Sequence, residues 1–274
     1  ADHIDVVAGD TSFSPLGIGA FASRQTVTAG NSALAAARQV AEKARLIAAE
    51  LLEAAPQDIE LRDGAAHVRG VPQMSRRLGE LAKAVNGSIG FALPGGLTPG
   101  LFAASDYQVA GTPFACGAHV AEVEVDCETG GVDLIRYVAI HDCGRVINPQ
   151  IVEGQVLGAI VHGIGNALFE WMRYDDGGQP LTVTYGDYLL PASDVVPRIE
   201  VLHLETPSPL NPLGVKGAAE GGTIAAPAAV VSAIEDALSP LGVRVRDLPV
   251  TPYRLRRLIE EAQAAQGRSQ PPLR

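Results

Sequence analysis

The sequence predicts an α+β protein in which mixed or antiparallel sheets pack against helices. Two segments that alternate between apolar and polar residues flank a short turn, and two long apolar helical segments follow them. An amphipathic helical segment precedes them, and the order of elements lacks the regular alternation of a doubly wound parallel sheet. The composition is that of an ordered globular protein, since 47% of the residues are hydrophobic and 19% are charged.

In the N-terminal third, Ile4–Val7 is expected to form a short strand, followed by a loop rich in Gly, Pro and Ser at 9–22. Asn31 or Ser32 could cap a long helix, because the apolar residues that follow lie three or four positions apart. These residues are Ala33, Ala36, Val40, Ala44, Ile47 and Leu51.

After that helix, Ile59–Leu61 and Ala66–Val68 predict a small hairpin around Asp63-Gly64. A short helix is expected over Arg76–Val85. The stretch 87–111 is rich in Gly and Pro and is expected to cross the molecule without regular structure.

The clearest strand pair is predicted over Val120–Asp126 and Val132–Ile140, around the turn at 127–131. A second β region is expected at Leu181–Tyr185 and Ile199–Leu204. The strand predicted over Val120–Asp126 alternates apolar residues with acidic ones, which is the pattern of a half-exposed strand. The acidic residues are Glu122, Glu124 and Asp126.

Two helices are predicted at 151–171 and 224–238, the second starting near Ala226-Pro227 because proline suits a first helical turn. No repeat or low-complexity linker marks a domain boundary. We therefore expect residues 1–265 to form one region of two intimately packed lobes, and the polar, Pro-containing residues 266–274 to form a flexible tail.

Charge and cysteine content narrow the function classes. The formal net charge of −10 disfavours binding to a nucleic-acid backbone and suits a cytoplasmic enzyme. Three cysteines without a CxxC pair argue against a disulfide framework or an iron–sulfur site within this chain. No membrane span is expected, because four polar residues interrupt the apolar helix: Glu153, Gln155, His162 and Asn166.

One carboxylate stands out as a candidate site residue. Glu220 lies alone in the small-residue loop Lys216–Thr223, directly before an apolar helix. The N–H groups and positive dipole end of that helix would face the loop and favour an anionic ligand. The alternative is a flexible turn with a solvated glutamate.

A second glycine-rich segment supports a binding site. Asp142–Pro149 precedes the predicted helix 151–171, which contains four glycines that each cost about 1 kcal/mol relative to alanine. Close approach of another backbone or of a ligand is the usual reason for such glycines, which here are Gly154, Gly158, Gly163 and Gly165.

Taken in order, these motifs resemble the C-terminal part of the large, molybdopterin-binding subunit of the xanthine oxidase/aldehyde oxidase family of molybdenum hydroxylases. The resemblance runs from about residue 4 to about residue 260. It rests on Gly9-Asp10-Thr11, Ala22-Ser23-Arg24, Val123–Asp126 with Thr129-Gly130, His141–Arg145 with Asn148-Pro149, Glu153-Gly154-Gln155, Gly163-Ile164-Gly165, and Lys216-Gly217 with Glu220.

The resemblance also implies a missing part. In that family the large subunit is longer, and its N-terminal portion carries a glycine-glutamine-glycine loop over the molybdenum. This chain is therefore expected to be one piece of a split large subunit or a fragment of a longer polypeptide, holding an incomplete cofactor site.

The resemblance assigns roles to individual residues. Glu220 matches the catalytic glutamate, a general base beside the molybdenum; the loop departs from the common valine-containing version at Ala218-Ala219. Gln155 matches a glutamine that hydrogen-bonds the pterin or an oxo ligand, the alternative being a satisfied core amide. His162 stands where the family often has glutamine, and Cys143 is expected to be structural.

A loop near the N-terminus would hold the dithiolene and phosphate end of the cofactor. It comprises Ala22, Ser23 and Gln25, with Arg24 adding positive charge; the alternative is an ordinary turn. Lys216, next to Gly217, would either contact the cofactor or form a structural ion pair. No protein ligand to the metal is expected, because the pterin dithiolene with oxo and sulfido groups completes the coordination of molybdenum.

The function implied is hydroxylation of an aldehyde or an N-heterocycle with oxygen derived from water. The cofactor would be molybdopterin, with its cytosine dinucleotide form left open. Electrons would pass to 2Fe-2S clusters and FAD on partner subunits. A non-catalytic structural or assembly subunit of such a complex is the alternative.

Overall fold

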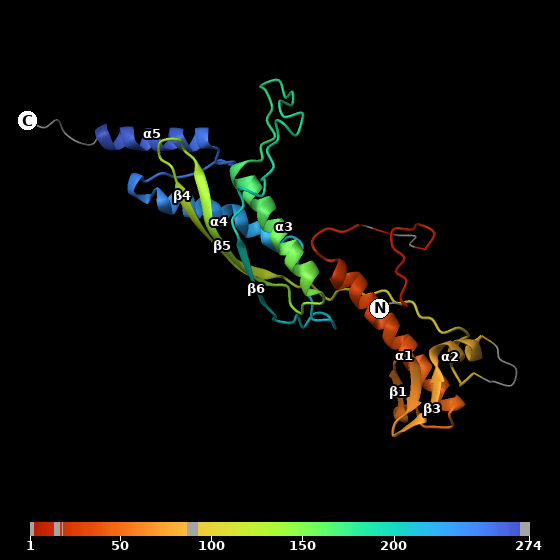
Figure 1. Cartoon of the computed structure of the whole chain (residues 1–274). Coiled ribbons are helices and arrows are strands. Elements are labelled where there is room, and N and C mark those ends of the chain that lie inside the picture. The colour runs from red at the N-terminus through yellow and green to blue at the C-terminus, as the bar shows by residue number, and fades with distance from the viewer. Residues whose placement is uncertain (1–2, 14–16, 18, 87–92, 269–274) are drawn as a thin grey trace, which may run out of the picture. The chain divides into compact units, whose positions relative to one another are not determined.

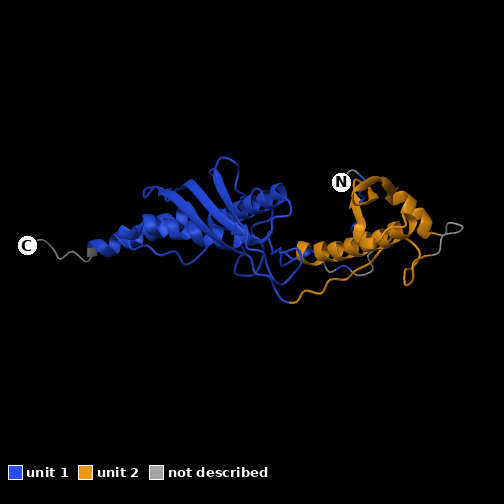
Figure 2. Cartoon of the chain, turned by 90° about the horizontal axis from the view of Figure 1, so that it is seen from below, with its two compact units in different colours: residues 1–25, 111–274 blue, residues 26–110 orange. Residues whose placement is uncertain are grey.

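The computed structural model describes residues 3–13, 17, 19–86 and 93–268. The chain forms two compact units, one made of residues 1–25 and 111–274 and the other of residues 26–110 (Figure 2). The predicted α+β class is confirmed. Figure 1 shows helices and small sheets following one another along the chain. The prediction of two intimately packed lobes within residues 1–265 stays a prediction.

The unit of residues 26–110 is built on a long helix and a small sheet. A π-helical turn, Thr26–Gly30, leads into α1 (Asn31–Leu51). A 3-10 turn, Pro56–Asp58, then leads into the sheet, whose order is β1-β2-β3. The strands are β1 (Ile59–Arg62), β2 (Ala65–Val68) and β3 (Val71–Arg77), and α2 (Leu78–Val85) follows them.

The hairpin predicted around Asp63-Gly64 is confirmed. Both residues have positive φ, of 50° and 74°, which a two-residue turn between antiparallel strands needs. The apolar side of α1 packs on this sheet and on α2, and the core of the unit contains Ala44, Ile47, Ala48, Ala49, Leu52, Ile59, Ala66, Leu81 and Val85.

Two predictions for this unit are wrong in detail. Neither Asn31 nor Ser32 caps α1, because the chain is already helical from Thr26 and the buried Asn31 side chain donates to the Val27 carbonyl at 2.7 Å. The sequence did not predict β3, whose residues are mostly exposed and lack alternation, so the predicted helix over Arg76–Val85 in fact begins at Leu78.

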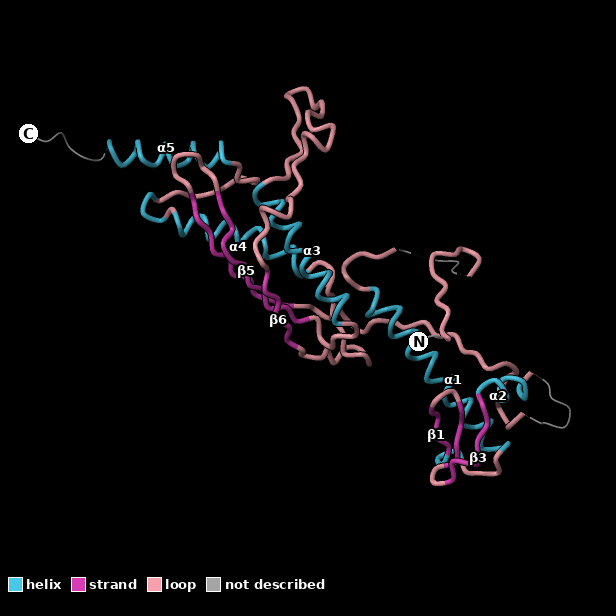
Figure 3. The backbone as a smooth tube through the Cα atoms, viewed as in Figure 1, coloured by secondary structure: helices cyan, strands magenta, loops and turns pink. Residues whose placement is uncertain are grey.

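The described residues of the other unit form the second sheet and three α-helices. Its sheet has the order β4-β5-β6, with β4 (Cys116–Val125) and β5 (Val132–Asp142) antiparallel. The strand β6 (Ile199–Leu204) runs parallel to β5 after the crossover through α3 (Pro149–Leu168). Figure 3 shows the three strands side by side.

One face of this sheet carries the main core. The helices α3 and α4 (Gly221–Ala237) pack against each other and against the sheet, and α5 (Pro252–Arg268) adds Leu255 and Ile259 to the same cluster. A 3-10 turn, Ser239–Leu241, follows α4. In the described part of the chain, α3 is the one helix that could cross a membrane by length and composition, yet Ile160 and Ile164 are fully buried in this core.

The strands predicted at Ile4–Val7 and Leu181–Tyr185 are wrong. Residues 4–7 pair with no strand among the described residues, and Val6 is 85% exposed. In the second segment, side-chain hydrogen bonds replace a ladder: Thr182 donates to the Trp171 carbonyl, and Asp187 accepts from the Thr184 hydroxyl and amide. This segment belongs to the loop that projects beyond α3 in Figure 1.

The helix boundaries also shift. The predicted helix 151–171 is α3, and Asn148 caps it by accepting from the Ile151 amide at 3.2 Å. Helix α4 begins at Gly221, before the expected start at Ala226-Pro227, so Pro227 lies inside it. The sequence did not predict α5, which extends to Arg268, past the predicted start of the tail at 266.

Candidate active site

Glu220 is an exposed residue immediately before α4. Ser23 lies against it and makes two hydrogen bonds. The Ser23 hydroxyl donates to Glu220 Oε2 at 2.5 Å, and the Glu220 amide donates to Ser23 Oγ at 3.1 Å. A hydroxyl can donate and accept at once. The pair therefore holds both the carboxylate, through Oε2, and its backbone.

The turn that carries Ser23 has an unusual backbone. Ala22 and Ser23 both have φ of 52°, in the left-handed region that residues with a Cβ rarely adopt. Such conformations cluster at functional sites. Gly217 permits the contact with the opposite loop, since a Cβ there would lie 2.7 Å from the Ser23 Cβ.

The other residues of this loop interact within it. The Gln25 side chain donates to the Gly19 carbonyl at 3.0 Å. The Arg24 guanidinium lies 4.2 Å from the centre of the Phe21 ring, which is a cation–π contact. Of the four residues predicted here, Ser23 makes a side-chain hydrogen bond to Glu220.

Lys216 forms the structural ion pair that the sequence left open. Its Nζ lies 3.1 Å from Asp142 Oδ2 and 2.7 Å from Thr206 Oγ1. Burial of Asp142 acts to raise its pKa, but hydrogen bonds from the Thr206 hydroxyl, the Gly144 amide and Lys216 outweigh burial and hold the pKa well below its usual range. This network anchors the start of the Glu220 loop to the end of β5.

Cys143 is buried beside this network, 3% exposed, and burial raises the pKa of its thiol. Its carbonyl accepts from the Lys216 amide at 2.7 Å. A buried thiol with a raised pKa is a poor nucleophile. The structural role expected for Cys143 therefore agrees with its surroundings.

Helices α3 and α4 approach each other through glycines. A Cβ at Gly163 would lie 2.5 Å from the Ala226 Cβ, and one at Gly222 would lie 2.5 Å from the Val156 carbonyl oxygen. A Cβ at Gly165 would meet Glu170, whereas at Gly154 and Gly158 it would meet no atom within 4 Å. Close approach of described residues therefore explains Gly163 and Gly165. It does not explain Gly154 and Gly158.

Gln155 lies on α3 directly before Val156, whose carbonyl faces Gly222. It is exposed, so the alternative of a satisfied core amide is wrong. His162, which stands where the resembling family often has glutamine, has its Nδ1 3.2 Å from the Thr223 hydroxyl.

The sequence assigned no role to His141, which lies under this site. It is 1% exposed, and a Cβ at Gly221 would lie 2.3 Å from its Cε1. Burial lowers the pKa of His141, with nearby His203 and His119 acting in the same direction and Asp142 opposing them. The glycine directly after Glu220 was the one sequence feature that could have drawn attention to a close neighbour here.

The described residues contain no group of three or more His, Cys, Asp or Glu side chains placed to hold a metal ion. What the site offers is one carboxylate, a serine hydroxyl and the amide groups at the start of α4. This arrangement can accept a proton and can hydrogen-bond a polar ligand.

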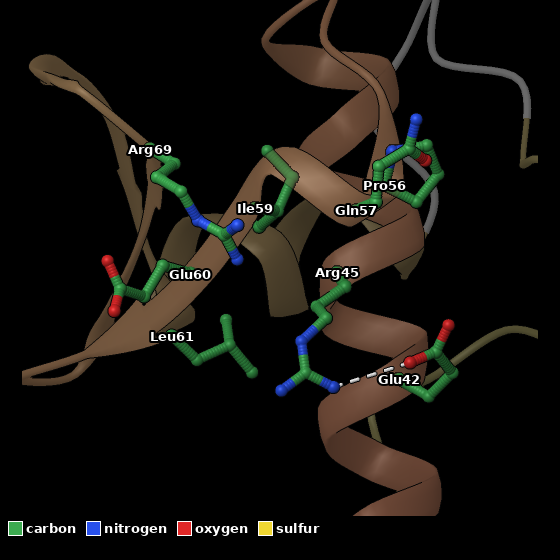
Figure 4. A pocket seen from close by; sticks show the side chains of 8 residues that line it. All are labelled: Glu42, Arg45, Pro56, Gln57, Ile59, Glu60, Leu61 and Arg69. Atoms are coloured by element: carbon green, nitrogen blue, oxygen red, sulfur yellow. Dashed lines mark hydrogen bonds and ion pairs between the residues drawn. The ribbon is translucent and has the colours of Figure 1, made fainter.

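The pocket in Figure 4 lies in the other unit and contains none of the predicted site residues. Its volume is about 550 Å³, and the Arg45–Glu42 ion pair of 3.3 Å lies at its wall. The residues that line it are Glu42, Arg45, Pro56, Gln57, Ile59, Glu60, Leu61 and Arg69.

Comparison with known proteins places this geometry in context. The profile of the molybdopterin cofactor-binding domain matches residues 1–197. In Paenarthrobacter nicotinovorans, the 6-hydroxypseudooxynicotine dehydrogenase complex subunit gamma is 42% identical over 93% of this chain, and the nicotine 6-hydroxylase large subunit is 40% identical over 93%.

The solved structure of quinoline 2-oxidoreductase from Pseudomonas putida 86 has the same fold. It is 43% identical, with a TM-score of 0.81 over 89% of this chain. In each case the match covers only part of the longer protein: 32% of the dehydrogenase subunit, 31% of the hydroxylase subunit and 31% of the quinoline enzyme chain. The chain thus spans about a third of the length of the curated relatives it matches.

Proposed function

Because the chain belongs to the family of molybdopterin cofactor-binding domains, we propose that it forms part of the active site of a molybdenum hydroxylase. The reaction would be the oxidation of an aldehyde or the hydroxylation of an N-heterocycle, with oxygen derived from water. Relatives named for the hydroxylation of nicotine and the oxidation of quinoline support the heterocycle as the substrate class. The observation that carries the proposal is the hydrogen bonding of Glu220 by Ser23.

The residues present fit a molybdopterin cofactor. A group that brings its own metal ligands needs polar contacts from the protein, and the exposed Gln155 amide and the amide groups at the start of α4 could supply them. When bound, the cofactor would supply the two-electron redox chemistry. Its polar edges would be held by Gln155 and by the backbone of Ala22 and Ser23, with Arg24 adding positive charge nearby.

Glu220 would act as the general base. Its Oε2 accepts from Ser23, so Oε1 is the atom that would take the proton as oxygen is transferred to the substrate. Gly217 would contribute by letting the Ser23 turn approach, which keeps the carboxylate in one orientation. The orientation matters because a general base can accept a proton only when it lies within hydrogen-bond distance of the donor.

The partners would be the remainder of the large subunit, a subunit with 2Fe-2S clusters and a subunit with FAD, as in the resembling family. One support is the part of the relatives' length that this chain does not span. Another is the outer face of the β4–β6 sheet, where Val120 is 66% and Leu202 is 45% exposed. The cofactor could take the cytosine dinucleotide form, and the location would be cytoplasmic.

Glu220→Gln in the natively assembled enzyme tests this proposal. We expect unchanged molybdenum content and a fall in turnover on the order of 100-fold or more, the scale for loss of a positioned base. Glu128→Gln, in the exposed β4–β5 turn, is the matched control and should behave as wild type. Turnover that survives Glu220→Gln would show that another group is the base.

The same preparation addresses the alternative of a structural or assembly subunit. Metal analysis should find molybdenum near one equivalent per complex if the chain helps to hold the cofactor. A complex that is folded and assembled but contains no molybdenum would favour the non-catalytic role.

A further inference from the structure

His141 lies directly behind the turn that presents Glu220. It is the penultimate residue of β5, it is 1% exposed, and its side chain is on the face of the sheet that packs against α4. A Cβ at Gly221 would lie 2.3 Å from its Cε1 and 2.8 Å from its Nδ1. Since Gly221 follows Glu220 immediately, the ring touches the backbone that carries the carboxylate.

The contact exists only because residue 221 has no side chain. Distances below 3.0 Å are not found between a real Cβ and a neighbouring atom, so any other residue would push the α4 terminus off the ring or displace the ring. The next residue, Gly222, is pressed in the same way against the Val156 carbonyl. The first turn of α4 is therefore held between β5 and α3.

Packing alone does not account for a histidine at this position. Among the described residues its Nε2 is a buried nitrogen without a hydrogen-bond partner. An unsatisfied buried polar atom costs on the order of 1–3 kcal/mol, and leucine would fill a similar volume without that cost. Positions where stability is given up in this way are expected at functional sites.

The surroundings of the ring are mainly unfavourable to a positive charge. The ring is buried, two other histidines are near it, and the positive end of the α4 dipole lies at Gly221. One of these histidines, His119, has its Nδ1 2.8 Å from the Tyr137 hydroxyl. Asp142 is the neighbouring group that acts to raise the pKa of His141. A neutral ring supports the turn without forming an ion pair with Glu220.

We propose that His141 is a positioning residue for Glu220. The flat, neutral imidazole bears on Gly221 and sets the position of the first turn of α4, and with it the orientation of the Glu220 carboxylate and its hydrogen bond to Ser23. This inference rests on the proposed role of Glu220 as the base.

The primary test compares His141→Leu with wild type in the natively assembled enzyme. The branched side chain keeps the volume and removes the unpaired nitrogen, but it cannot lie flat on Gly221. We expect unfolding stability to be unchanged or higher, molybdenum content and KM to be unchanged, and kcat to fall about 10-fold to 100-fold, the scale for a misplaced catalytic group. His119→Ala, which removes the ring opposite Ala139 on the same sheet face, should lower stability and leave kcat unchanged.

A readout that does not depend on turnover is the exchange rate of the Glu220 amide hydrogen, which is protected by Ser23 Oγ. It should rise about 10-fold or more in His141→Leu if the turn shifts. Gly221→Ala should produce the same defects from the opposite side of the contact. Combined with His141→Ala, its effect on kcat should be smaller than the sum of the two single effects, because the added methyl group then has room.

Wild-type kcat and exchange in His141→Leu, or strictly additive effects in the double variant, would overturn the inference. Glu220→Gln in the same assay distinguishes a failure of the positioning role of His141 from a failure of the proposed role of Glu220. If it abolishes turnover while the His141 variants are normal, only the positioning role fails. If it remains active, the proposed role of Glu220 as the base fails.

Discussion

The Ser23 hydroxyl and the Glu220 carboxylate lie 2.5 Å apart although 197 positions separate them in the sequence. The bond joins the turn at Ala22-Ser23, with its left-handed backbone, to the loop that begins at Lys216. Lys216 is in turn paired with the buried Asp142. The carboxylate is therefore positioned by the N-terminal segment and by β5 as well as by its own helix.

Ser23→Ala removes the hydroxyl that orients Glu220 and should lower turnover about 10-fold, less than the loss of the carboxylate itself. One hydrogen bond to a charged group is worth about 1.5–3 kcal/mol, which sets the upper limit of this effect. Steady-state kinetics of the assembled enzyme measure it. Ser12→Ala removes a comparable bond, the 2.6 Å contact with Asp10 in the exposed N-terminal segment, and should leave turnover unchanged. Equal effects of the two substitutions would contradict a specific role for Ser23.

Lys216→Met leaves the carboxylate of Asp142 buried without its counter-charge. The two side chains are 13% and 4% exposed, so we expect a loss of about 3 kcal/mol or more in the free energy of unfolding. Denaturant titration is the measurement. Arg136→Met breaks the exposed pair with Glu200, whose side chains are 63% and 51% exposed, and should cost less than about 1 kcal/mol. A loss of similar size in both variants would show that burial does not strengthen the Lys216 pair.

The depressed pKa of Asp142 predicts a loss of stability in acid. In the unfolded chain the pKa of an aspartate is about 3.9, so the stabilisation by this carboxylate is complete above that pH. As the pH falls through the lower pKa of the folded state, the carboxylate is protonated and the stabilisation is lost. The difference in unfolding free energy between wild type and Asp142→Asn should therefore shrink below about pH 4. A difference that stays constant from neutral pH into acid would contradict this assignment.

Local patterns in the sequence were sufficient for some elements of the fold and not for others. The Asp63-Gly64 turn and the β4–β5 pair carry strong local preferences, and both form as predicted. The apolar residues of Ile4–Val7 have the composition of a strand but no neighbouring strand to pair with among the described residues. The strand β3 forms in spite of a polar, irregular pattern, because β2 offers it an edge. Whether a partner strand is available decides such cases, and the local pattern of one segment does not show that.

The candidate site shows the same limit. Glu220 could be singled out from its loop, and family resemblance supplied Ser23, but no local pattern indicates that the two touch. The position of His141 depends on β5 meeting the first turn of α4. This contact joins His141 to Gly221, 80 positions later in the sequence. Proline placement misled the prediction for α4, because Pro227 lies within the helix where α3 packs closely on it.

The glycines of α3 provide a last, internally controlled prediction. At Gly163 a Cβ would lie 2.5 Å from the Ala226 Cβ, so Gly163→Ala should force α3 and α4 apart and destabilise the protein by about 1–3 kcal/mol. At Gly158 a Cβ would meet no atom within 4 Å, so Gly158→Ala should instead stabilise the isolated chain by up to about 1 kcal/mol through helix propensity. Thermal or denaturant unfolding of the two variants distinguishes them, because the same substitution in the same helix is expected to act with opposite sign. If Gly163→Ala were as harmless as Gly158→Ala, the close packing of α3 on α4, and with it the seating of the turn after Glu220, would be wrong.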